Sequence, residues 1–136
     1  MKKINIREIV TLSAPQKYIN GTAWISSLIN ESSAGCSLSS VTFEPGARTH
    51  WHSHPTVQIL MAQNGVGYVQ KRNELKQLMQ PGDVVVIYPG EEHWHGATPE
   101  SMFSHLAIQM EKDEGIIISK VTNEEYLAPP GSRYIS

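Results

Sequence analysis

The chain of 136 residues is long enough to bury the core of one domain, and we expect that domain to span residues 1–136. Hydrophobic residues make up 40% and charged residues 18%, a composition that excludes a disordered chain. The formal net charge of −2 gives no attraction to nucleic acid or to an anionic membrane surface, so we expect neither as a partner.

The first residues do not have the pattern of an export signal. The N-terminus carries basic residues, but the apolar segment of a signal peptide does not follow them. No apolar run approaches the roughly 20 residues that cross a bilayer. Cys36 is the only cysteine, so an intramolecular disulfide cannot form. We therefore expect a cytoplasmic protein.

Residues 1–20 are predicted to form an N-terminal arm, because their apolar side chains are too few for a core of their own. We expect this arm to pack on a second copy of the chain across a two-fold axis, which makes a homodimer with a substantial buried interface. The apolar residues of the arm are Ile4, Ile6, Ile9, Val10, Leu12 and Tyr18.

Short strand-like segments follow, separated by Pro-Gly and Asn-Gly turns. The turn at Asn64-Gly65 is typical of a hairpin, so we expect 66–71 to pair with the apolar segment 57–62. The β-branched run 83–88 predicts a core strand. Closely spaced strands of this kind indicate an all-β barrel or sandwich. The other predicted strands are 22–29, 36–43 and 101–111.

Only one segment near the C-terminus has a helical pattern. Thr122 is a typical N-cap, and Glu125 stands three residues later, as in a capping box. The tail 129–136 is expected to be loose. The sequence thus predicts a β-domain with a short C-terminal helix.

All six histidines lie in the middle of the chain, most of them in two short phrases at 49–54 and 92–96. Neutral imidazole is the commonest protein ligand of divalent transition metals. Side chains two residues apart on a strand point to the same face, so two histidines of the first phrase can reach one ion. A third would come from a second strand. The predicted ligands are His52, His54, Gln58 and His93.

This donor set contains nitrogen and oxygen without thiolate, which favours Mn, Fe, Co, Ni or Zn but does not select one of them. Gln58 could instead be a core amide without metal contact. His50 and His95 could join the metal shell or lie outside it. His105 could act as a general base near an open metal site, or it could be a buried packing residue.

The spacing of these residues resembles that of the cupin superfamily, which has double-stranded β-helix barrels of the jelly-roll type. The first cupin motif is matched from Gly46 to Gly65, with glutamine in place of the family's glutamate. The second is matched from Gly82 to Ala97, where its first proline and final asparagine are missing. The two motifs cover 46–97. The resemblance implies an all-β cupin barrel with an N-terminal arm and a short C-terminal helix.

A narrower resemblance is to the bacterial cupin hydroxynitrile lyases, which are manganese-dependent enzymes that cleave or form cyanohydrins. It is carried by residues 41–60, 81–97 and 105–109. It implies one divalent ion, Mn, with Fe, Ni, Co and Zn as alternatives, held by His52, His54, Gln58 and His93. His50 stands where a small residue is expected, and it is predicted to narrow the cavity. The candidate catalytic residues are His105, Gln109 and His95.

The resemblance favours a metal-dependent enzyme that performs redox-neutral lyase chemistry on a carbonyl or cyanohydrin substrate. Two other functions stay open at this point. Cupins with the same ligands and Fe or Ni can be dioxygenases, and some cupins are metal-dependent binding or sensor modules without catalysis. The sequence alone does not separate these three, because a fold does not determine a function.

Overall fold

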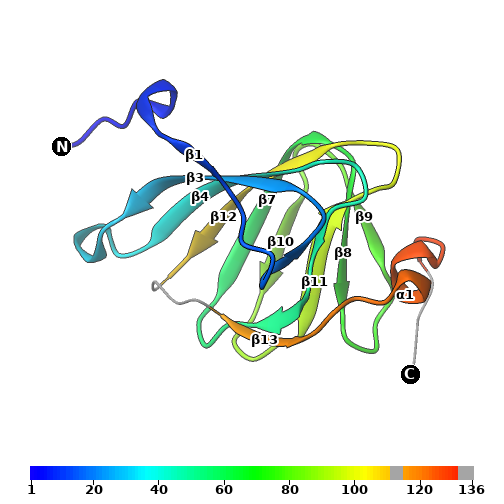
Figure 1. Cartoon of the computed structure of the whole chain (residues 1–136). Helices are drawn as coiled ribbons and strands as arrows, with labels where there is room; N and C mark the ends of the chain where they lie inside the picture. The colour runs from blue at the N-terminus through cyan, green and yellow to red at the C-terminus, as the bar shows by residue number, and fades with distance from the viewer. Residues whose placement is uncertain (111–114, 132–136) are drawn as a thin grey trace.

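The computed structural model describes residues 1–110 and 115–131, which form two facing β-sheets and one short α-helix (Figure 1). The first sheet has six described strands in the order β1-β3-β4-β12-β7-β10. These strands are β1 (Thr11–Ser13), β3 (Ala23–Asn30), β4 (Ser37–Phe43), β12 (Phe103–Gln109), β7 (Gln58–Gly65) and β10 (Val84–Ile87).

The second sheet has seven described strands, five of them in the order β13-β6-β11-β5-β2. Strand β8 also pairs with β11, and β9 pairs with β8. The strands are β13 (Ile116–Ser119), β6 (Trp51–Ser53), β11 (His93–Ala97), β5 (Arg48–Thr49), β2 (Ile19–Asn20), β8 (Gly67–Lys71) and β9 (Gln77–Met79). Of two 3₁₀ turns, η1 (Ile6–Glu8) precedes β1 and η2 (Ser32–Ala34) connects β3 to β4.

The main core lies between the two sheets. Phe43, Leu60 and Phe103 come from the first sheet, and Val69 and Ala97 come from the second. Burial of these apolar side chains from both sheets holds the two layers together. The predicted all-β architecture is confirmed.

The predicted C-terminal helix is also confirmed, as α1 (Asn123–Leu127). The Thr122 hydroxyl accepts from the Glu125 amide, and the Glu125 carboxylate accepts from the Thr122 amide, which is a complete capping box. The ammonium of Lys76 donates to Tyr126 O at 2.6 Å and ties the helix to the barrel. Among the described residues, no helix is long and apolar enough to span a membrane.

Two strand predictions are wrong in detail. β8 does not pair with β7, because the chain crosses at Gly65 to the other sheet, where β8 pairs with β11. A turn signal specifies a left-handed φ, here +74° at Gly65, but it does not specify which strand becomes the partner. β10 is an edge strand with only one face in the core: Val84 and Val86 are 53% and 44% exposed, whereas Ile87 belongs to the core and Val85 packs against it.

The N-terminal arm is part of both sheets. β1 pairs with β3, and β2 pairs with β5, so residues 11–20 run along the barrel, whereas the chain before β1 extends away from it (Figure 1). Of the tail that we expect to be loose, residues 132–136 lie outside the described residues.

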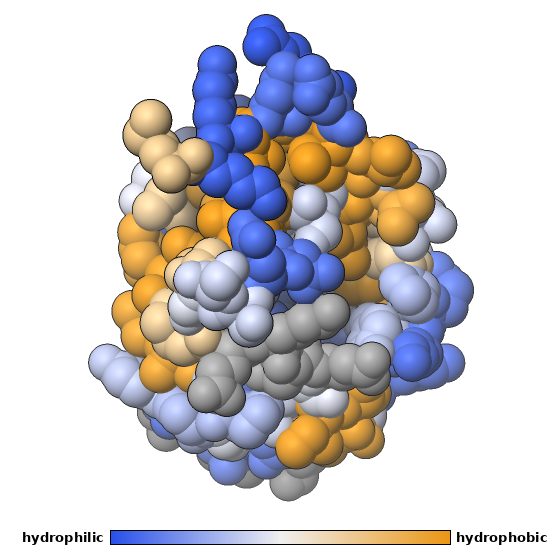
Figure 2. All heavy atoms as spheres, turned by 90° about the vertical axis from the view of Figure 1, so that its left-hand side faces the viewer, coloured by the Kyte–Doolittle hydropathy of each residue, from blue (hydrophilic) through white to orange (hydrophobic). Residues whose placement is uncertain are grey.

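We expect the chain to form a homodimer at micromolar concentration. Val10 and Leu12 are 72% and 64% exposed; Leu12 lies in β1, at the end of the six-stranded sheet, and Val10 directly precedes that strand. On this face, hydrophobic residues gather on both sides of a hydrophilic strip (Figure 2). Light scattering should give the mass of two chains, and Leu12→Lys should lower it, because a charge would have to be buried. A monomeric wild-type protein would contradict the prediction.

Candidate metal centre

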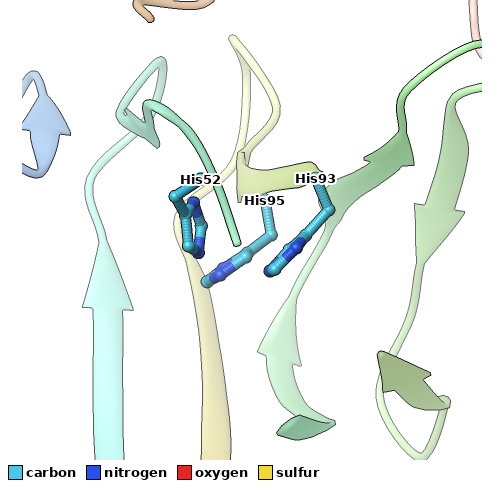
Figure 3. A group of neighbouring side chains, drawn as sticks. All are labelled: His52, His93 and His95. Carbon is cyan, nitrogen blue, oxygen red and sulfur yellow. The ribbon is translucent and has the colours of Figure 1, made fainter. Parts of the chain in front are cut away.

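Three histidine rings converge on one point from two neighbouring strands. His52 of β6 pairs directly with His93 of β11, and His95 follows two residues later on the same face of β11. Ring nitrogens of the three residues all lie within 4.8 Å of one another, and the side chains point the same way (Figure 3). All three residues are buried. This confirms that the two histidine phrases meet in space.

Backbone carbonyls set the tautomers of two of these rings. His52 Nδ1 lies 2.7 Å from His50 O, and His93 Nδ1 lies 2.8 Å from Glu91 O. A carbonyl oxygen only accepts hydrogen bonds, so each Nδ1 carries the proton and donates it. Each Nε2 therefore presents a lone pair, as a metal ligand must.

Gln58 begins β7 and faces His93 from the opposite sheet. Its Oε1 lies 3.2 Å from His93 Nε2. With Nδ1 of His93 protonated, both atoms offer lone pairs, as two neighbouring ligands of one cation would. Neighbouring ligands of an octahedral ion at about 2.1 Å are about 3 Å apart. The residues present thus fit a divalent metal ion.

His54 lies next to this group, with its ring centroid 5.0 Å from that of His52 and 5.7 Å from that of His93. Its Nδ1 is 3.0 Å from the amide nitrogen of Gln109. His95, rather than His54, has a ring nitrogen within 4.8 Å of ring nitrogens of His52 and His93. The three-nitrogen cluster therefore contains His95, and the metal role of His54 stays a prediction.

His105 lies behind His95, on the strand β12. Its Nε2 is 3.0 Å from His95 Nδ1, so one of these nitrogens donates to the other. The pairing register between β12 and β7 shifts between Ser104 and His105. Such bulges change the direction of a side chain, and here the residue after the shift faces the cavity. The His105 ring is fully buried between Phe43 and Phe103.

Burial keeps these histidines neutral. It lowers the pKa of His93 to about 4 and that of His105 to about 4, because the charged ring would lose its hydration. The pKa values of His52 and His95 are lowered well below the ordinary range, first by burial and then by the neighbouring His93 and His105 respectively. Neutral imidazole is the form that binds metal ions.

A cavity of about 280 Å³ opens onto the histidines. Its wall is mostly apolar, with polar groups gathered at the metal side, which is typical of small-molecule sites. The predicted catalytic residues His95, His105 and Gln109 all line it. The remaining lining residues are Tyr18, Ile19, Ile25, Ser39, Val41, Phe43, Thr49, His52, His54, Gln58, Ala107 and Ile117.

His50 is placed differently from the expectation. It does not line the cavity, and so it does not narrow it. Its ring turns toward the N-terminal arm, where Nε2 is 3.1 Å from Gln16 O. Sequence reasoning also missed the cavity-lining residues Tyr18 and Ile117. Only the pairing of β2 and β13 with the second sheet brings them there, and no local pattern indicates it.

The outer faces of the metal strands are supported by a second aromatic cluster. Trp51 follows His50 and precedes His52, and Trp94 stands between His93 and His95, so both tryptophans point away from the cavity. They pack with Tyr68, Val121 and Tyr126. The indole of Trp51 donates to Glu125 at 3.2 Å, and that of Trp94 donates to Gln70 at 3.0 Å. Both tryptophans are packing residues of this cluster.

We expect the metal-stripped protein to lose stability as the pH falls from 7.5 to 5. The folded pKa of His93, about 4, lies below its unfolded value of about 6.5, so the unfolded chain binds more protons in this window. The free energy of unfolding should therefore decrease by about 2 kcal/mol from His93 alone by pH 5. Urea titrations at several pH values measure it. His93→Gln should reduce the pH dependence of the free energy of unfolding. A wild-type protein that is equally stable from pH 7.5 to 5 would contradict the prediction.

The sequence and the structure were compared with those of known proteins, and the matches agree on one family. Residues 39–108 match the family described as Cupin domain. An (R)-mandelonitrile lyase from Granulicella tundricola is 48% identical over 89 residues, which are 64% of this chain and 68% of that protein. A cupin-like protein from Thermotoga maritima is 36% identical, with a TM-score of 0.78 over 84% of this chain and 89% of that one.

A more distant structure shows the same fold. The polyketide cyclase RemF from Streptomyces resistomycificus is 16% identical, with a TM-score of 0.74 over 93% of this chain and 90% of that one. At this level of identity the likeness concerns the arrangement of strands.

Proposed function

Since the chain belongs to the Cupin domain family, we propose that it is a metal-dependent lyase that cleaves or forms the cyanohydrins of small carbonyl compounds. The observation that carries this proposal is the neutral histidine and glutamine donor set at the wall of an apolar cavity, with a further neutral histidine behind it. The similarity to an (R)-mandelonitrile lyase supports the substrate class.

The residues that would hold the ion are His52, His93 and Gln58, together with His54 or His95. We propose Mn, with Fe, Ni, Co or Zn able to occupy the same donors. When bound, the ion supplies Lewis-acid polarisation of an oxygen and attracts an anion. Because Gln58 is neutral where a glutamate would carry a charge, the site keeps the full positive charge of the ion.

The chain's own residues carry the proton. His105 is neutral at pH 7, so it can accept the hydroxyl proton of a cyanohydrin. The bond between the carbinol carbon and the nitrile carbon then breaks, and its electron pair leaves with cyanide. The products are the aldehyde and, after the proton is returned, hydrogen cyanide. The pair of His105 Nε2 and His95 Nδ1 at 3.0 Å holds the base in place.

The apolar wall excludes water and positions the organic part of the substrate. Val41 and Phe43 come from β4, and Ile25 comes from β3. Their side chains can contact an aliphatic or aromatic group but cannot hydrogen-bond to it. We therefore expect carbonyl compounds with apolar substituents to bind better than polar ones.

The test is metal analysis of the purified protein, followed by reloading with single metals and assays of each form. With Mn, mandelonitrile should be cleaved to benzaldehyde and cyanide, and oxygen should not be consumed. Oxygen consumption with a small organic substrate and no cyanohydrin turnover would favour a dioxygenase instead. Tight metal and ligand binding without either reaction would favour a sensor or binding module. Either result would overturn the lyase proposal.

A further inference from the structure

We propose that the segment 14–20 is the wall of the cavity that selects the ligand, with Tyr18 as the specificity-determining residue and His50 as the positioning residue that holds this wall. The proposal rests on the lyase function in one respect, since it concerns the cavity in which the carbonyl compound would bind. It gives a role to His50, which lies outside the three-nitrogen cluster.

Tyr18 lies where a ligand of the cavity would meet the N-terminal arm. It lines the same cavity as His52, His54 and Gln58, and it packs against the main core. Lys17 Nζ lies 4.9 Å from the centroid of the Tyr18 ring. The neighbouring Ile19 is buried and also lines the cavity. An aromatic ring and an aliphatic side chain from the arm thus complete a wall that the barrel strands leave open.

His50 connects this wall to the strand that carries the metal-side histidines. Its amide donates to Tyr18 O at 2.9 Å, and its ring Nε2 lies 3.1 Å from Gln16 O. The adjacent pairing is short, with Ile19 opposite Thr49 and Asn20 opposite Arg48. The imidazole therefore adds a side-chain bond to the segment that directly precedes the two-residue strand β2.

The hydrogen bond also turns the ring of this histidine toward the arm, and His50 is outside the three-nitrogen cluster. A carbonyl oxygen accepts only, so Nε2 of His50 must carry the proton and donate it to Gln16. The ring is buried, at 5% exposure, and its direction is set by the arm rather than by the cavity. His50 is thus tied to the arm, whereas His52, two residues later, faces the ion site.

The chemistry of the wall favours a ligand with an aromatic ring. Tyr18 offers a ring face or edge, and aromatic pairs gain energy beyond simple burial. Val41, Phe43 and Ala107 offer apolar contacts from the opposite sheet. Benzyl alcohol is a suitable probe, because it has a ring and one hydroxyl but cannot undergo the lyase reaction.

The experiment measures binding of benzyl alcohol to the metal-loaded protein by calorimetry, and selectivity as the ratio of kcat/KM for mandelonitrile and acetone cyanohydrin. Tyr18→Ala should weaken benzyl alcohol binding about tenfold and lower the ratio, because the ring contact is lost. Tyr18→Phe should keep both. His50→Ala should weaken binding by about 2–10-fold, and His50→Gln should restore it, because an amide N–H can replace Nε2 as the donor.

Three controls separate this role from a general loss of structure. Metal content should stay at that of the wild type in every variant. Amide hydrogen exchange in 14–20 should accelerate in His50→Ala but not in His50→Gln. Tyr88→Ala, at a residue that is 60% exposed and outside the cavity lining, should leave benzyl alcohol binding unchanged.

These experiments distinguish a failure of the wall proposal from a failure of the lyase proposal. If the wild type lacks cyanohydrin turnover while benzyl alcohol binding still depends on Tyr18 and His50, the lyase proposal fails and the wall proposal holds. If Tyr18→Ala binds benzyl alcohol as the wild type does, or if the wild type does not bind it, the wall proposal is overturned. A loss in His50→Ala that His50→Gln does not restore would remove the positioning role.

Discussion

His52→Ala is expected to abolish binding of a divalent metal, whereas His50→Ala should keep most of it. The His52 Nδ1 is committed to His50 O at 2.7 Å, so its Nε2 points into the cluster with a free lone pair. Removing this ligand should weaken metal affinity by more than about 100-fold, because even outer partners of a ligand are worth 10–100-fold. Equilibrium dialysis with metal analysis measures the stoichiometry and affinity of each variant.

His50→Ala is the matched control, because it removes a histidine of the same phrase whose ring bonds to the arm. Equal loss of metal in both variants would show that the assignment of these two rings is wrong. The same measurement on His54→Ala and His95→Ala decides between the two candidates for the third imidazole. The cluster of ring nitrogens predicts the larger loss for His95→Ala, whereas the resemblance to the lyases predicts it for His54→Ala.

His105→Ala is expected to lower turnover by about 10²–10⁴-fold while the metal stays bound, which is the usual range for loss of a general base. His105 contacts His95 Nδ1 at 3.0 Å and is outside the three-nitrogen cluster. The measurement is kcat for mandelonitrile cleavage, normalised to the folded and metal-loaded fraction. A melting temperature for each variant keeps the loss of packing separate from the loss of the base.

His105→Gln is the informative companion variant. Glutamine fills much of the space of the imidazole and can hydrogen-bond to His95, but it cannot accept a proton at neutral pH. If His105 is the base, both variants should lose turnover, although His105→Gln should melt closer to the wild type. If turnover per folded molecule stays intact in both, the residue only packs between Phe43 and Phe103, and the base lies elsewhere.

Much of the site was predictable because strand alternation is a local property. Histidines two residues apart share a face on any strand, so His52 and His54 could be placed together before the fold was known. The same alternation placed His105 and Gln109 on one face of β12, and both line the cavity. The capping residues Thr122 and Glu125 act within a single turn and therefore identified the helix correctly.

Other features depend on contacts between segments far apart in the chain. The partner of β8 is set by which sheet buries Val69, and the turn at Gly65 carries no information about that choice. The arm reaches the cavity only because β2 pairs with β5, which makes Tyr18 a wall residue.

The histidines show most clearly which features follow from the sequence and which depend on the tertiary structure. The sequence alone determined the residue types, their spacing and the all-β setting, because these follow from local periodicity. Only the tertiary structure decided that His95 joins the nitrogen cluster and that His50 turns away from it. The direction of a ring and the position of its proton depend on which carbonyl it meets. The carbonyl that meets His50 belongs to Gln16, a residue that the fold alone brings to it.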